Sequence, residues 1–105
     1  MKRAMQALLI AGERQKEEVL SGKKKITIRK DHRDYSTGSV LIGCHILNWA
    51  TLKTITGIRF TTVGELTPEE LQDNGLLDDL DALEVLREYY PDLTLESKVT
   101  VIRWK

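Results

Sequence analysis

Two periodicities follow one another along this chain of 105 residues, and their order limits the folds it can adopt. Apolar and polar residues alternate over residues 25–30 and again over 98–105, a pattern typical of strands. Between them, residues 78–90 carry apolar side chains at helical spacing. The full expected order is strand, helix, several strands, two helices and a final strand. This order predicts an α+β fold, built as a small barrel or half-barrel because closure removes exposed sheet edges.

The other strands are predicted from apolar runs bounded by turn residues. At the N-terminus, Met1-Lys2-Arg3 and the apolar run after it are similar to an export signal. A buried strand is preferred there, because Gln6 interrupts the run and no small-residue cleavage site follows. The expected elements are a strand at 4–10, a short helix at 13–20, a buried strand at 39–47, a hairpin tip at 48–50 and a strand at 51–63 bent at Gly57.

The clearest local signal is a helix start at Thr67. We expect Thr67 to cap the helix, Pro68 to take its first position and Glu70 to complete a capping box, with Asn74-Gly75 as the stop. A second helix is expected over 78–90, ended by Pro91. Its expected buried stripe consists of Leu80, Leu83, Leu86 and Tyr90.

Composition excludes several classes of protein. Apolar residues make up 41% of the chain, enough for one domain over residues 1–105, and no apolar run is long enough for a membrane span. The single cysteine, Cys44, rules out an internal disulfide and suits a cytoplasmic protein. Sixteen basic residues balance sixteen acidic ones, so bulk charge does not drive binding to a polyanion.

The zero net charge conceals an asymmetry along the chain. Residues 1–34 contain ten basic and five acidic side chains, whereas residues 65–92 contain one arginine and ten acidic side chains. A basic patch on a neutral protein suggests a locally held anionic ligand, such as a phosphate, a nucleotide or RNA. The alternative, given equal weight, is that the two patches face solvent or pair with each other.

The segment from Gly22 to Arg29 concentrates groups that could carry chemistry. Gly22 allows a sharp turn from helix into strand, three lysines follow, and Thr27 and Arg29 share the polar face of the strand. Like charges lower the pKa of a neighbouring lysine, which can then act as a general base beside a threonine nucleophile. We expect Lys24, Thr27 and Arg29 to line one concave pocket, with the chain bent near Lys24. The alternative is a solvated basic run beside an ordinary strand.

Five other noticeable residues receive structural interpretations. A solvated His32 is preferred to a metal site, and His45 is expected to be half-buried in a strand. Cys44 is an improbable nucleophile because it has no paired cysteine and no base at fixed spacing. Trp49 is expected to pack in the core rather than stack on a base, and Trp104 to lie in the core.

Gly22-x-Lys24-x-x-x-x-Arg29 matches the G-x-K-x-x-x-x-R signature of the ASCH domain family. The chain resembles that family over residues 19–104, and in particular its small bacterial N(4)-acetylcytidine amidohydrolase type, whose strand K-T-I-T-I-R corresponds to residues 24–29. Further similarity lies in Leu20-Ser21-Gly22, Tyr35-x-Thr37-Gly38-x-Val40-Leu41 and Tyr89-Tyr90-Pro91.

The resemblance implies a PUA-like β-barrel with short helices bordering a cleft, and hydrolysis of the acetyl amide of N(4)-acetylcytidine or a related modified nucleoside. It implies Lys24 as the base and Thr27 as the nucleophile. The family's glutamate falls near Asp73, which is preferred as the acid or orienting group, with Glu70 as the alternative. The substrate-binding residues expected are Gly22, Arg29 and Lys25, which replaces a small hydroxyl residue of the family.

Two rivals use the same cleft without catalysis: an RNA-binding module, and a regulatory domain that has lost its ligand. The acidic stretch at 65–92 would repel a long phosphate backbone, which favours a modified nucleoside over RNA. No cofactor, metal or membrane is expected, and the sequence does not indicate an oligomeric state.

Overall fold

A computed structural model of the chain describes residues 6–10, 13–44 and 48–105. The elements follow the expected order, with Gly22 at φ +83° just after the first helix. The strands are β1 (Gln6–Leu9), β2 (Ile26–Lys30), β3 (Gly38–Cys44), β4 (Trp49–Thr62) and β5 (Lys98–Trp104), and the helices are α1 (Glu13–Leu20), α2 (Pro68–Asp73) and α3 (Asp79–Leu86), with a 3₁₀ turn, η1, at Val63–Glu65.

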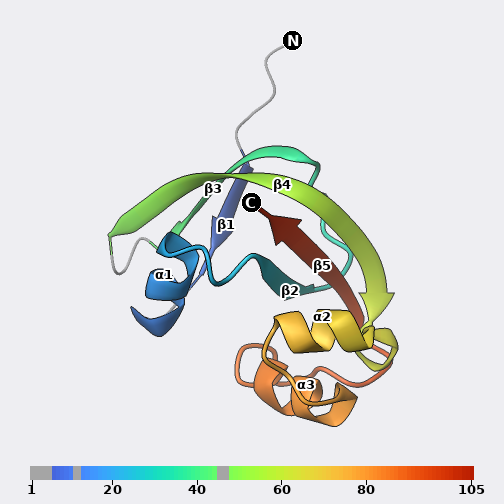
Figure 1. Cartoon of the computed structure of the whole chain (residues 1–105). Helices are drawn as coiled ribbons and strands as arrows, with labels where there is room; N and C mark the ends of the chain where they lie inside the picture. The colour runs from blue at the N-terminus through green and yellow to red at the C-terminus, as the bar shows by residue number, and fades with distance from the viewer. Residues whose placement is uncertain (1–5, 11–12, 45–47) are drawn as a thin grey trace.

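The five strands form one mixed sheet in the order β1-β3-β4-β5-β2. β1 runs parallel to β3, and every other neighbouring pair is antiparallel. The sheet curls strongly, and β4 arches over the whole molecule (Figure 1). The register of β4 shifts between Ile55 and Gly57, so the expected bend at Gly57 is confirmed. The expectation of an α+β half-barrel is therefore confirmed.

Side chains link the two edge strands, which share no backbone ladder. Arg29 of β2 donates a hydrogen bond from Nη2 to the carbonyl oxygen of Leu9 in β1, at 2.6 Å. Tyr35 donates from its hydroxyl to the carbonyl oxygen of Ala7, at 3.2 Å. These donors occupy carbonyls of β1 that would otherwise be free to pair with another strand.

Two hydrophobic clusters lie on opposite faces of β5, which explains why that strand is buried on both sides. Inside the curl, Ile102 and Trp104 pack with β1, β3 and Val19 of α1. On the other face, Val99 and Val101 pack with β2, α2 and α3. Trp104 is a core residue, as expected, and Trp49 is half-buried against the inner cluster.

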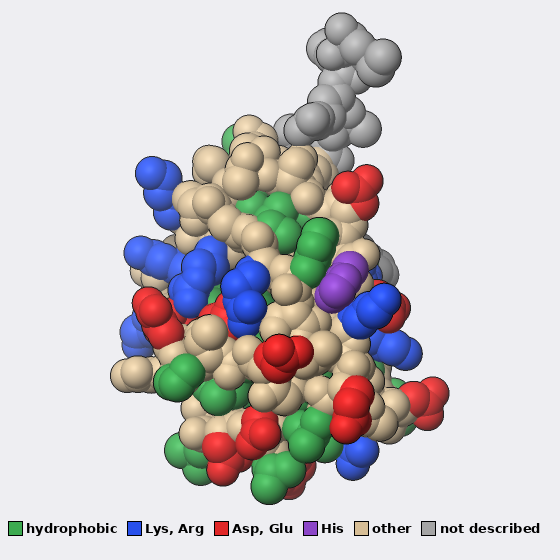
Figure 2. Space-filling view, turned by 90° about the vertical axis from the view of Figure 1, so that its right-hand side faces the viewer, with side chains coloured by type: hydrophobic (Ala, Val, Ile, Leu, Met, Phe, Trp, Pro, Cys, Tyr) green, Lys and Arg blue, Asp and Glu red, His purple; other side chains and the backbone are tan. Residues whose placement is uncertain are grey.

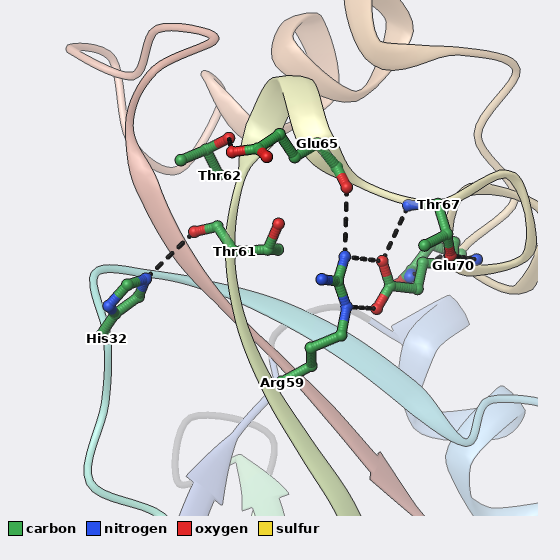
Figure 3. A network of polar contacts seen from close by, with 8 residues as sticks. His32, Arg59, Thr61, Thr62, Glu65, Thr67 and Glu70 are labelled. Carbon is green, nitrogen blue, oxygen red and sulfur yellow. Dashed lines mark hydrogen bonds and ion pairs between the residues drawn. The ribbon is translucent and has the colours of Figure 1, made fainter.

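The capping box of α2 forms as the sequence predicts. Thr67 accepts a hydrogen bond from the Glu70 backbone, and the Glu70 carboxylate accepts one from the Thr67 backbone at 2.9 Å. The same carboxylate pairs with Arg59 of β4 at 2.7 and 2.8 Å (Figure 3). The pKa of Glu70 is lowered below its usual range, chiefly by the hydrogen bonds that Arg59 donates to its carboxylate. The hydrogen bond from the Thr67 backbone lowers this pKa further, and burial acts in the opposite direction without outweighing them. Glu70 thus joins α2 to the sheet.

The second helix is shorter than predicted, and its buried stripe is different. α3 ends at Leu86, after which i→i−3 bonds such as Tyr89 N–H to the Leu86 carbonyl tighten the chain. The prediction that Leu80 is buried was wrong, because its side chain is 62% exposed. Leu86 is buried as expected, and Leu83 and Tyr90 are partly buried against the same cluster. Ala82, which was not expected in the stripe, faces the core as well, and its small side chain lets the helix approach the 3₁₀ turn closely.

The expected hairpin tip at 48–50 was partly wrong. Trp49 pairs with Cys44 and Ala50 pairs with Gly43, so both already belong to the β3–β4 ladder. Asn48 precedes them at φ +54°, a conformation that asparagine tolerates. His45, the end of the strand expected at 39–47 and the start of the strand expected at 4–10 lie outside the described residues. None of the helices described is long and apolar enough to cross a membrane.

Candidate active site

A cavity of about 790 Å³ lies along the free edge of β2, between α1 on one side and α2 and α3 on the other. It occupies the side on which the half-barrel stays open, so its walls come from both hydrophobic clusters. The volume falls within the range of small-molecule sites, roughly 300–1,000 Å³. Its polar lining residues are Gln15, Glu18, Lys23, Lys24, Thr27, Arg29, Gln72, Asp73, Asn74, Tyr89 and Tyr90.

Lys24 lies in the junction between α1 and β2 rather than in the strand. Gly22 turns the chain, and the Lys24 backbone N–H then bonds to the carbonyl oxygen of Glu18 at 2.9 Å. β2 begins two residues later at Ile26. In a regular strand, Lys24 and Thr27 would point to opposite faces. Because Lys24 lies outside the ladder, both residues line the same cavity.

Lys24 is electrostatically unusual. Burial lowers the pKa of its ammonium group below the ordinary 10.5, the positive charge of Arg29 lowers it further, and Glu18 acts in the opposite direction. A lysine pKa lowered by like charges was predicted from the sequence; the like charge that contributes is Arg29, and burial, which was not foreseen, is the larger cause. A lysine with a lowered pKa carries a larger neutral fraction and is a better proton acceptor.

Thr27 and Arg29 present polar groups to the same cavity from β2. Thr27 is only 7% exposed, and its hydroxyl has no hydrogen-bond partner in the part of the chain that the structure describes. Arg29 uses Nη2 for the bond to Leu9, while its Nε–H is buried with no partner among the described residues. A hydrogen-bond donor that is buried without a partner is energetically costly.

Asp73 lines the cavity from the last residue of α2. Its Oδ2 accepts a hydrogen bond from Nη1 of Arg103 in β5, at 2.8 Å. Glu70, the alternative to Asp73, does not line the cavity, because its carboxylate is occupied by the capping box and by Arg59.

The other two expected binding residues, Gly22 and Lys25, are not part of the cavity wall. Gly22 supplies the turn, and Lys25 accepts a backbone bond from Trp104 while its side chain is exposed. Cys44 is buried and lines the cavity as an apolar group. His32 stacks on Phe60 with ring centroids 4.8 Å apart, and the described residues contain no cluster suited to a metal ion.

The mouth of the cavity was not foreseen in the sequence. Gln15 of α1 donates a hydrogen bond to the hydroxyl of Tyr89, just after α3, at 3.4 Å. These residues are 74 positions apart, and although Tyr89 belongs to the Tyr89-Tyr90-Pro91 segment, no sequence signal links it to Gln15, so only the folded chain brings them together. Tyr89 is 55% exposed, which places an aromatic side chain at the entrance.

Acidic side chains gather over the helical part of the molecule. In Figure 2, most of the acidic groups in view lie in the lower half, below most of the basic ones. This agrees with the acidic composition of residues 65–92, which include α2 and α3. Within the cavity itself, the helical side contributes one acidic residue, Asp73, and the side of α1 and β2 contributes Lys24 and Arg29 together with Glu18.

Comparison of the chain with protein-family models, with curated proteins and with solved structures gives no match in any of the three searches. Function is therefore inferred from the residues of the cavity and from the motif that they form.

Proposed function

We propose that this cavity hydrolyses the acetyl amide of N(4)-acetylcytidine or of a related modified nucleoside. The proposal is supported chiefly by one observation, the meeting of Lys24, Thr27 and Arg29 in a cavity of about 790 Å³. The substrate class comes from the resemblance of residues 22–29 to the ASCH amidohydrolase type. On the same resemblance, we propose that the half-barrel is of the PUA-like type. A nucleoside is of the size that such cavities hold.

In the first half of the reaction, Thr27 Oγ1 attacks the acetyl carbonyl carbon while the neutral Lys24 amine accepts the hydroxyl proton. The positively charged guanidinium of Arg29, a residue of the cavity wall, stabilises the oxyanion that develops. The carbon–nitrogen bond then breaks, and the Lys24 ammonium returns its proton to the departing exocyclic nitrogen. The products of this half are cytidine and acetylated Thr27.

In the second half, Lys24 accepts a proton from a water molecule, which attacks the acetyl-threonine ester. The ester bond breaks, Thr27 regains a proton from Lys24, and acetate leaves. Asp73 is assigned to orienting the substrate rather than to donating a proton. Its Oδ2 already accepts a hydrogen bond from Arg103, which is the role of an acceptor.

The test is incubation of the protein with N(4)-acetylcytidine, followed by chromatography for cytidine. The wild type is expected to release cytidine, and Thr27→Val and Lys24→Met are each expected to lower the turnover by about 10²–10⁴-fold, the usual contribution of an acid–base group. Lys98→Met is the matched control, because Lys98 is exposed on β5 and absent from the cavity wall. Wild-type protein that releases no cytidine contradicts the proposal.

A non-catalytic RNA-binding module predicts a different pair of results. The wild type would show no hydrolysis, and its RNA affinity would fall steeply with salt. Lys24→Met would then flatten the salt dependence by about one counterion. The acidic composition of residues 65–92, part of which borders the cavity, favours a small ligand over a phosphate polymer, so hydrolysis is the preferred function.

A further inference from the structure

From the depth of the cavity and the ion pair at its rim, we infer that Asp73 recognises the ribose of the substrate and that Arg103 is its positioning residue. The inference rests on the proposed hydrolysis of an acylated nucleoside, and it adds selection of the sugar. It assigns a function to Arg103, which lies outside the cavity wall and outside every sequence motif.

The first argument is the depth of each group. Thr27, the nucleophile, is 7% exposed, whereas the side chain of Asp73 is 41% exposed. Both line the same cavity, so a ligand that places its acetyl group at Thr27 directs its opposite end toward the more open wall. In an N(4)-acetylated nucleoside, the sugar is the end opposite the acetyl group.

The second argument is the unfavourable position of Asp73 in its helix. Asp73 is the last residue of α2, and the last turn of that helix contains no basic residue. A carboxylate at this end faces the negative pole of the helix dipole, which destabilises it. Arg103 offsets this from the neighbouring strand through the 2.8 Å bond to Oδ2. The pair thus holds a carboxylate where local helix preferences disfavour one.

The third argument is the hydrogen-bonding capacity left on Asp73. Among the described residues, Arg103 alone bonds to the carboxylate, and it uses Oδ2. Oδ1 therefore retains its acceptor capacity. The hydroxyls of a ribose are donors that carboxylates commonly bind in nucleotide sites. A 2′-deoxyribose has one such donor fewer.

The experiment compares N(4)-acetylcytidine with N(4)-acetyl-2′-deoxycytidine by kcat/KM. The wild type is expected to prefer the ribonucleoside by about ten- to a hundredfold, the usual effect of a hydrogen bond to a charged group. In Asp73→Asn, this ratio is expected to fall several-fold toward one. Arg103→Gln should lower it as well, and Arg103→Lys should restore part of it. Glu84→Gln is the matched control, because Glu84 is exposed on α3 and absent from the cavity wall.

Three outcomes overturn the inference: equal kcat/KM for both substrates in the wild type, an unchanged ratio in Asp73→Asn, or an unchanged ratio in Arg103→Gln. A proton-donating Asp73 would give the second of these, with both rates falling together. If neither compound is hydrolysed, the proposed function fails, and the ribose inference is decided by calorimetric binding of cytidine against 2′-deoxycytidine. Preference for cytidine that is lost in Asp73→Asn supports it, and absence of any preference or of any binding overturns it.

Discussion

At the scale of single residues, Lys24 lies in an environment that differs from that of an ordinary surface lysine. Its ammonium is withdrawn from water at the junction of α1 and β2, with the positive charge of Arg29 nearby. Charged lysine is disfavoured there, and its pKa is lowered. A base of this kind works in its neutral form, so catalysis and the pH dependence of folding both depend on the same proton.

The first prediction concerns the pH profile of hydrolysis. We expect kcat to rise with pH through a pKa below the ordinary lysine value of 10.5, because the neutral fraction of Lys24 increases. Arg29→Gln removes a charge that lowers this pKa, so the rising limb should move to higher pH. Glu18→Gln removes a charge that raises it, so the limb should move to lower pH. The measurement is kcat against pH for the three proteins.

The control for this prediction is Lys24→Met, which should have no such limb in its residual activity. The same variant tests folding. Between the lowered pKa and 10.5, the unfolded chain binds more protons than the folded one, so the free energy of unfolding should rise with pH in the wild type. That rise should be smaller in Lys24→Met. Limbs that coincide in Arg29→Gln and Glu18→Gln would contradict the assignment of Lys24.

At the scale of elements, the agreement between sequence and structure depends on how local each determinant is. α2 was predicted together with its cap, first residue and stop, because Thr67, Pro68 and Glu70 act within one turn. The extent of α3 was not predicted correctly. Its packing depends on contacts with the 3₁₀ turn, and just after its end Arg87 donates a hydrogen bond from Nε to the Leu93 carbonyl oxygen. Apolar spacing alone could not show that Leu80 faces solvent.

The residues of the candidate site also fall into those that are close in sequence, which could be predicted, and those that are distant, which could not. Lys24, Thr27 and Arg29 lie within six residues of one another, so a single motif could indicate all three. The Arg103–Asp73 pair spans 30 residues, and the Gln15–Tyr89 contact spans 74. Neither pair has a local signature, because the first depends on how α2 is placed against β5, and the second on how α1 and the end of α3 are placed beside the sheet.

The second prediction tests the corrected packing of α3. Leu86 is 8% exposed and packs in the cluster beneath the helix, so Leu86→Ala should destabilise the fold by about 2–5 kcal/mol. Leu80 is 62% exposed, so Leu80→Ala should change stability by less than about 0.5 kcal/mol. Urea denaturation of the two variants checks both values. Equal costs for the two substitutions would show that α3 packs through the stripe first expected.

At the scale of the whole molecule, the cavity connects two hydrophobic clusters that otherwise meet through β5. One wall carries Ile10 and α1, which belong with the inner cluster, and the other carries Leu86 and Tyr90 from the helical cluster. A ligand that fills the cavity therefore touches both halves at once. Binding to the folded state alone stabilises it by mass action, and here the stabilisation should extend to both clusters.

The third prediction follows from that arrangement. Saturating cytidine, the product of the proposed reaction, should slow amide hydrogen exchange both in β1 and in α2–α3. Residues 58–62 of β4 serve as the internal reference, since they do not line the cavity, and their exchange should change least. The measurement is exchange mass spectrometry with and without cytidine. Protection confined to one of the two walls would show that the ligand does not bridge them.

The two edge strands, β1 and β2, are linked by side chains rather than by a backbone ladder, and this affects how fast the cavity between them can widen. A closed barrel widens only when ladder hydrogen bonds break, a collective event on the microsecond-to-millisecond scale. Here the bond from Arg29 to Leu9 spans the opening, and that from Gln15 to Tyr89 spans the mouth, so both are made by side chains. Side-chain rotamers change faster than strands separate. Ligand entry should therefore be limited by diffusion and desolvation rather than by opening of the sheet.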